Sequence, residues 1–141
     1  MRRVDRWDTA LFQWASARIG QPFKWGETDC AMLTLEAHDV VTGDALAPLY
    51  RGRWTSEREA RRFMRQHDID LLRRLRAAGS VDVVINFQQR GDLILAPQDG
   101  WMCGHVCLGA RALSSCPDLG VNLIPTAAVL ALPDVHVLRP A

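Results

Sequence analysis

The sequence predicts an α+β domain in which N-terminal helices pack on a C-terminal antiparallel sheet. Up to Gly79, apolar residues recur at the three- and four-residue spacings of a buried helix face. From Val81 onward they form short runs divided by Gly, Pro and Asp, which is typical of strands. The 141 residues contain no linker, repeat or low-complexity segment, so we expect a single domain over residues 1–141.

The first expected helix spans residues 6–18. Trp7, Leu11 and Trp14 fall at positions i, i+4 and i+7, so they should anchor one face of this helix in the core. The Gly-Gln-Pro sequence at residues 20–22 then ends the helix.

A second helix is expected from Asp29 to about Thr42. Asp29 is a favourable N-cap residue, which places Cys30 in the first turn. There the helix dipole favours the thiolate over the thiol, and cysteine peptidases use this effect to make a nucleophile. The alternative is that Cys30 is a small buried residue. His38 lies about 12 Å further along the axis, so we exclude it as a base for Cys30.

Residues 44–54 are expected to form a loop. Tyr50 and Trp54 are large apolar residues in otherwise polar surroundings within this loop. They either fill the core or form the rim of a substrate groove.

Ser56 and Glu59 form a capping box that starts a third helix, and a fourth, short helix follows it. Residues 51–76 carry nine Arg against four acidic residues, which gives a basic helical face. This face is expected to be solvated, or else to contact an anionic polymer or an acidic protein. Aromatic residues are not interleaved with the Arg residues, which argues against binding of single-stranded nucleic acid.

The C-terminal half is expected to form six strands and one brief helical turn. Pro125 is a favourable first residue for the turn, which spans residues 125–130. The expected strands span residues 81–86, 92–96, 104–109, 111–115, 120–124 and 135–138.

The composition is that of an ordinary globular protein, with 48% hydrophobic and 23% charged residues. A formal charge of +1 provides no strong field toward nucleic acid or membrane. No run approaches the roughly 20 apolar residues of a membrane span. The N-terminus lacks an apolar region, so we expect no secretion signal, and we expect the four cysteines to be free thiols.

The segment PFKWGETDC, residues 22–30, resembles the nucleophile segment of the NlpC-type papain-like cysteine peptidases. More narrowly, it resembles the small phage- and prophage-encoded branch of that superfamily. The resemblance covers most of the chain. It includes Thr42-Gly43 after the nucleophile helix, YRGRW at residues 50–54 and RGDLIL at residues 90–95.

In that superfamily, a Cys that opens a helix is the nucleophile, a His on the sheet is its base, and a third polar residue orients the His. By position, the resemblance implies Cys30 as nucleophile and His105 as base. Ser115 is the expected third residue, with Asn122 or a backbone carbonyl as alternatives. The expected substrate-binding residues are Trp25, Asp29 and Trp54.

The resemblance implies a tail-associated cysteine peptidase that hydrolyses peptidoglycan stem-peptide amide bonds without a metal or cofactor. Such a protein would be made in the host cytoplasm without a signal peptide, reside in the virion tail and act at the cell envelope. Its partners would be peptidoglycan peptides and tail hub or baseplate proteins, not nucleic acid. The alternative is a catalytically weak or inactive structural component of a tail tip or baseplate, because the third catalytic residue has no clean match.

A third hypothesis is a metal or iron–sulfur site formed by Cys103, His105, Cys107 and Cys116. Their spacing is not a standard zinc pattern. However, residues 103, 105 and 107 would share one face of a strand, because side chains alternate along it. The simpler interpretation is that the two cysteines are small sheet residues on either side of the His.

Overall fold

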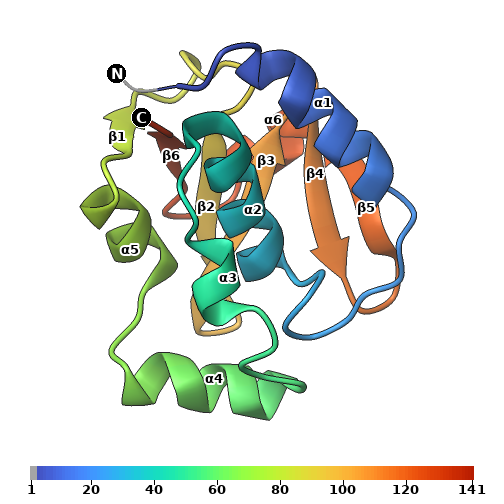
Figure 1. Ribbon diagram of the computed structural model, residues 1–141, viewed down its shortest axis with the longest axis vertical. Helices are drawn as coiled ribbons and strands as arrows, with labels where there is room; N and C mark the ends of the chain where they lie inside the picture. The colour runs from blue at the N-terminus through green and yellow to red at the C-terminus, as the bar shows by residue number, and fades with distance from the viewer. Residues whose placement is uncertain (1–2) are drawn as a thin grey trace.

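The computed structural model describes residues 3–141 and has an α+β architecture (Figure 1). The helices are α1 (Trp7–Arg18), α2 (Cys30–Thr42), α3 (Ala47–Tyr50), α4 (Glu57–Gln66), α5 (Leu71–Ala77) and α6 (Thr126–Leu130). The strands are β1 (Val81–Val83), β2 (Leu93–Gln98), β3 (Trp101–Cys107), β4 (Arg111–Cys116), β5 (Gly120–Pro125) and β6 (His136–Arg139). The predicted arrangement of N-terminal helices and a C-terminal sheet is confirmed.

The six strands form one sheet in the order β1-β6-β2-β3-β4-β5, and every neighbouring pair is antiparallel. Helix α2 lies across one face of the sheet, and α1 lies beside it (Figure 1). Leu93, Leu95 and Val106 point from the sheet into the main core with α2. Ile94, between Leu93 and Leu95, points to the opposite face, where it packs in a smaller cluster that includes Val129 of α6.

Helix α2 is the centre of the molecule, and most of its residues are buried. It begins at the predicted N-cap and ends at Gly43, which adopts a left-handed conformation with φ 81°. Gly104 of β3 faces this helix, and a Cβ there would collide with the hydroxyl of Thr34. Only glycine therefore permits this close approach of strand and helix.

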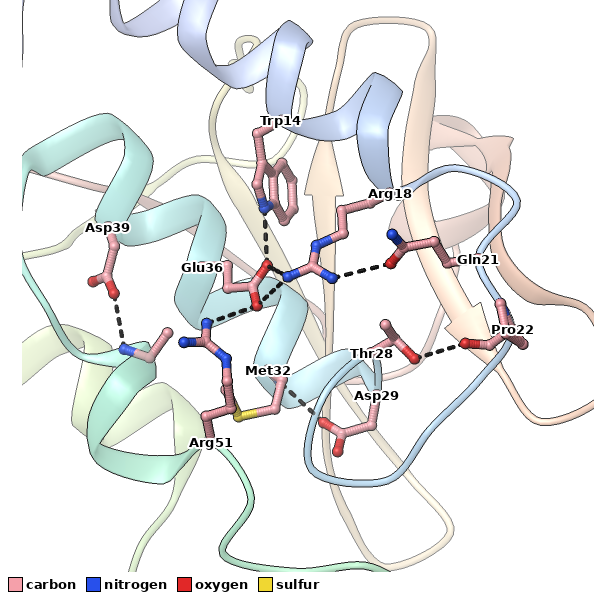
Figure 2. A network of polar contacts seen from close by, with 11 residues as sticks. Trp14, Arg18, Gln21, Pro22, Thr28, Asp29, Met32, Glu36, Asp39 and Arg51 are labelled. Carbon is pink, nitrogen blue, oxygen red and sulfur yellow. Dashed lines mark hydrogen bonds and ion pairs between the residues drawn. The ribbon is translucent and has the colours of Figure 1, made fainter.

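A buried carboxylate joins α2 to its neighbours (Figure 2). Glu36 is 6% exposed and accepts hydrogen bonds from Arg18 at 2.6 Å and Arg51 at 2.9 Å. The indole N–H of Trp14 also donates to it, at 2.9 Å. The two Trp residues predicted to anchor α1 do pack against the core, and Trp14 adds this polar contact.

Three elements differ from the expectation. β3 begins at Trp101, not at residue 104, because Asp99 and Gly100 (φ 51° and 85°) form a tight hairpin turn. β1 ends at Val83, and the following loop includes Asn86 at φ 80°. The predicted loop over residues 44–54 contains the short helix α3.

Candidate functional site

The start of α2 is held by the carboxylate of Asp29, which is 1% exposed. One oxygen accepts from the backbone N–H of Met32 at 2.9 Å and so caps the helix. The other accepts from the N–H of Gly26 at 2.6 Å and from the indole N–H of Trp54 at 2.8 Å. Asp29 is thus a structural cap, and this corrects the expectation that it contacts substrate.

Trp54 is also part of this internal network. It is 1% exposed and lies in the main core, so the structure corrects its expected place at a substrate site. Of the two interpretations that the sequence left open for Trp54, core packing is the one observed. Burying its N–H requires an acceptor, and Asp29 supplies it.

Cys30 lies where strands β3 and β4 separate. These two strands pair only at Val106 and Cys107 of β3. Beyond that point, the start of α2 contacts both strands. The hydroxyl of Ser115 on β4 donates to the carbonyl of Thr28, and Gly104 of β3 packs against Thr34 of the helix. Ser115 therefore anchors the loop that precedes the thiol.

The pKa of Cys30 is raised well above its ordinary value, chiefly by the neighbouring thiol of Cys103 and then by burial. The backbone of Gly104 lowers this pKa, but it is the weaker influence. The pKa of Cys103 is lowered, and the neighbouring thiol of Cys30 is the chief cause. This environment favours a neutral Cys30 thiol, whereas the sequence predicted a thiolate.

His105 makes its hydrogen bond to a serine and not to Cys30. Its side chain shares a hydrogen bond of 2.5 Å between Nδ1 and the hydroxyl of Ser114, and its Nε2 is buried without a hydrogen-bond partner. No hydrogen bond joins His105 to Cys30, because Nδ1 is bonded to Ser114 and Nε2 has no partner. Ser114 takes the position beside the imidazole that the sequence assigned to Ser115.

Burial lowers the pKa of His105 from 6.5 to about 4, so folding opposes its protonation. The pKa of His105 is lower in the folded state than in the unfolded state. The folded state therefore has its full stability above pH 6.5, where the imidazole is neutral in both states, and it loses stability as the pH falls toward 4. We expect wild type to lose about 3 kcal/mol more than His105→Asn between pH 7 and pH 4. Urea denaturation at several pH values measures this difference, and parallel pH profiles for the two proteins would contradict it.

Trp25 lies in an aromatic group with Phe23 and Trp101. Its ring is 5.9 Å from that of Trp101 and 4.8 Å from that of Phe23, measured between centroids. The guanidinium of Arg61 lies 5.0 Å from the Trp101 ring, and Trp101 is two residues from Cys103 along β3. Trp25 is therefore the predicted substrate-binding residue that remains partly exposed near Cys30.

A groove of about 810 Å³ lies between α4, α5 and the β2–β3 hairpin. The predicted basic helical face lines it, and three of its arginines are paired with acidic residues. Asp68 and Asp70 also line the groove, so its positive charge is partly neutralised. The lining includes Arg61, Arg65, Arg73, Arg76, Trp101 and Met102.

The sequence interpretation missed Cys103, Ser114 and Trp101 as neighbours of the site. The Asp-Gly pair at residues 99–100 is a strong hairpin signal, and it would have extended β3 back to Trp101. Which serine faces His105 depends on strand register, and no local signal in the sequence gives that register.

The metal hypothesis is not supported by the arrangement of side chains. Within residues 3–141, no group of three or more His, Cys, Asp or Glu side chains is placed to hold a metal ion. Cys107 instead donates to the carbonyl of Gly109, at 3.7 Å. The four proposed ligands are not brought together.

In the same part of the chain, no helix is long and apolar enough to cross a membrane. No curated protein and no solved structure matches the chain. A family model described as "Domain of unknown function (DUF6950)" matches residues 2–132. Because this match covers nearly the whole chain, the protein belongs to the DUF6950 family.

Proposed function

We propose that this chain is a structural component of a phage or prophage tail tip or baseplate that uses a papain-like, NlpC-type scaffold for binding and not for catalysis. The observation that carries this proposal is that the buried Nε2 of His105 makes no hydrogen bond to Cys30 or to any other group within residues 3–141. In a cysteine peptidase, the nucleophile needs a base within hydrogen-bond reach. Here the hydrogen bond of the imidazole is made by Nδ1 to Ser114, and the other ring nitrogen does not reach the sulfur.

Neighbouring thiols alone are poorly suited to amide hydrolysis. The attacking species must be a thiolate, and the raised pKa of Cys30 keeps its thiolate fraction low at neutral pH. After attack, the leaving amine needs a proton from a group that is a good acid near pH 7, as imidazolium is. An ordinary thiol, with a pKa of about 8.5, is a weaker acid for this step.

The partner in this proposal is a tail hub or baseplate protein. The groove beside α4 and α5 offers it a mixed surface of arginines, Trp101 and Met102. Arg and Trp are enriched at the energetic centres of protein interfaces, because each combines a large contact area with a polar group.

A second candidate is the cysteine peptidase that the resemblance implies, and one observation favours it. Cys30 is the first residue of a helix whose N-terminus is capped by Asp29. The backbone N–H groups of such a site can hold an oxyanion that forms next to the sulfur. In this candidate, Cys30 attacks a stem-peptide amide, Nε2 of His105 acts as its base, and Ser114 orients the imidazole through Nδ1. Trp25 is then the expected substrate contact.

Digestion of purified peptidoglycan separates the two candidates. The full chain and Cys30→Ser are incubated with cell-wall sacculi, and soluble fragments are measured by chromatography. The structural proposal predicts no release above that of the Cys30→Ser variant. Release by wild type that disappears in Cys30→Ser would overturn it and establish the peptidase.

The tail assignment is tested on phage particles produced by a strain that carries the gene. The chain should remain with purified tails through density-gradient separation, and particles with Cys30→Ser should infect as well as wild type. Absence of the chain from purified particles would refute the tail assignment under either candidate function.

A further inference from the structure

The positive charge of the molecule is concentrated in the segment that carries α4 and α5. Residues 51–76 contain nine Arg against four acidic residues, whereas the rest of the chain contains eight basic residues against twelve acidic ones. Helix α4 lies beside the turn of the β2–β3 hairpin (Figure 1), and Arg61 of α4 donates to the carbonyl of Asp99 in that turn at 2.7 Å. Arginines of this segment therefore line the groove of about 810 Å³ between α4, α5 and the hairpin.

Guanidinium groups in this groove are held in place and still have hydrogen-bond donors to offer. Arg61 donates to Glu57 through Nε and Nη2, and Arg73 donates to the carbonyl of Asp68 through Nη2. Within residues 3–141, the Nη1 group of each arginine makes no hydrogen bond. Arg65 is exposed and forms no ion pair in the same range. Because the planar guanidinium matches a carboxylate in geometry, the groove can bind carboxylates from outside the chain.

The groove also has an apolar floor. Met64, Ile69, Trp101 and Met102 line it and are partly buried. The guanidinium of Arg61 lies 5.0 Å from the centroid of the Trp101 ring, so a charged group and an aromatic surface are adjacent. Methionine side chains adapt their shape to a bound apolar group. The groove therefore favours a ligand that carries both carboxylates and an apolar side chain.

We propose that this groove binds an acidic segment of the partner protein. One apolar side chain of the segment packs on Trp101 and Met102, and carboxylates on either side of it pair with Arg65 and its neighbouring arginines. This inference rests on the proposed function, because it gives the chemistry of the partner that the tail component binds.

Two carboxylates in the groove favour a protein over a nucleic acid as the ligand. Asp68 and Asp70 both line the groove, and the Asp68 side chain is 91% exposed. A phosphodiester chain carries a negative charge at every nucleotide, so it would be repelled where it passes these residues. A peptide can place a neutral residue or a hydrogen-bond donor at the same points. The mixed charge of the groove therefore fits an acidic peptide with spaced carboxylates.

The test measures binding of the full chain to a fluorescent peptide by fluorescence anisotropy at physiological ionic strength. The peptide alternates glutamate and serine and has one central phenylalanine. Wild type should bind it, and a peptide with glutamine in place of glutamate should bind at least about tenfold more weakly. Replacing the phenylalanine with alanine should also weaken binding, because the apolar floor then loses its contact. These comparisons use wild type alone, so they decide even if a variant fails to fold.

Arg65→Glu should weaken binding of the glutamate peptide about tenfold, because it removes one attraction and adds one repulsion. Arg58→Glu is the matched control. Arg58 is also an exposed residue of α4, and the substitution changes the net charge equally, but Arg58 does not line the groove. The two positions are about 10 Å apart along the helix axis, which exceeds the Debye length of about 8 Å. Arg58→Glu should therefore change the affinity less than about threefold.

Three results would overturn the proposal: no binding of the glutamate peptide by wild type, equal weakening by Arg65→Glu and Arg58→Glu, or tighter binding of single-stranded DNA than of the peptide. The peptide assay and the particle experiment can fail separately. A chain that stays on purified tails but does not bind the peptide would leave the tail assignment standing and refute the acidic-segment site. A chain that binds the peptide but is absent from tails would refute the tail assignment alone.

Discussion

Asp29→Ala lowers the free energy of unfolding by about 4 kcal/mol. The substitution removes the N-cap of α2, which contributes about 1 kcal/mol. It also leaves the N–H groups of Gly26 and Trp54 buried without an acceptor, at about 1–3 kcal/mol each. Urea denaturation at pH 7, followed by far-UV circular dichroism, measures the loss.

Trp54→Phe is the matched control for Asp29→Ala. It keeps the aromatic volume and removes only one of the three donors, so it should lose about 1–2 kcal/mol. If Asp29→Ala is no more destabilising than Trp54→Phe, then Asp29 does not organise the start of α2 in the way that the hydrogen bonds indicate.

Asp92→Ala also lowers the free energy of unfolding by about 4 kcal/mol. Asp92 is fully buried, and both of its oxygens accept from Arg139 of β6 at 2.9 Å. It also accepts from the backbone N–H of Gln89 at 2.8 Å. The substitution removes hydrogen bonds between Arg139 and a charged acceptor, at about 1.5–3 kcal/mol, and leaves the N–H of Gln89 without its acceptor, at about 1–3 kcal/mol. Thermal and urea denaturation of the variant measure this loss.

The exposed ion pair between Arg76 and Asp82 provides the control for Asp92. Its geometry is similar, at 3.0 and 2.9 Å, but the Asp82 side chain is 63% exposed. Asp82→Ala should therefore cost less than about 1 kcal/mol. Equal losses of unfolding free energy in Asp92→Ala and Asp82→Ala would show that the burial of Asp92 does not strengthen its ion pair.

The parts of the fold that could be predicted are those fixed by local chemistry. Asp29 as N-cap, Gly43 as the end of α2 and Ser56 as a second N-cap are all confirmed, because each depends on residues within one turn of the helix. The strands in the C-terminal half were predicted for the same reason, since alternation and turn residues are local signals.

The site itself depended on contacts that no local signal reveals. β3 passes close to α2 at Gly104 and Thr34, and this approach is set by packing across the core and not by a local sequence signal. Ser114 and Ser115 show how sensitive such predictions are. Ser114 is the partner of His105, whereas Ser115, one residue further along β4, binds the carbonyl of Thr28.

The central claim is that Cys30 is not paired with an imidazole. The most direct test is the pH dependence of Cys30 alkylation, resolved by peptide mapping, in wild type, His105→Asn and Cys103→Ala. The claim predicts that Cys30 titrates above its reference pKa of about 8.5 in wild type, is unchanged in His105→Asn and titrates lower in Cys103→Ala. If Cys30 instead reacts as a thiolate below pH 7, and His105→Asn abolishes that reactivity, then a thiolate–imidazolium pair exists and the claim is wrong.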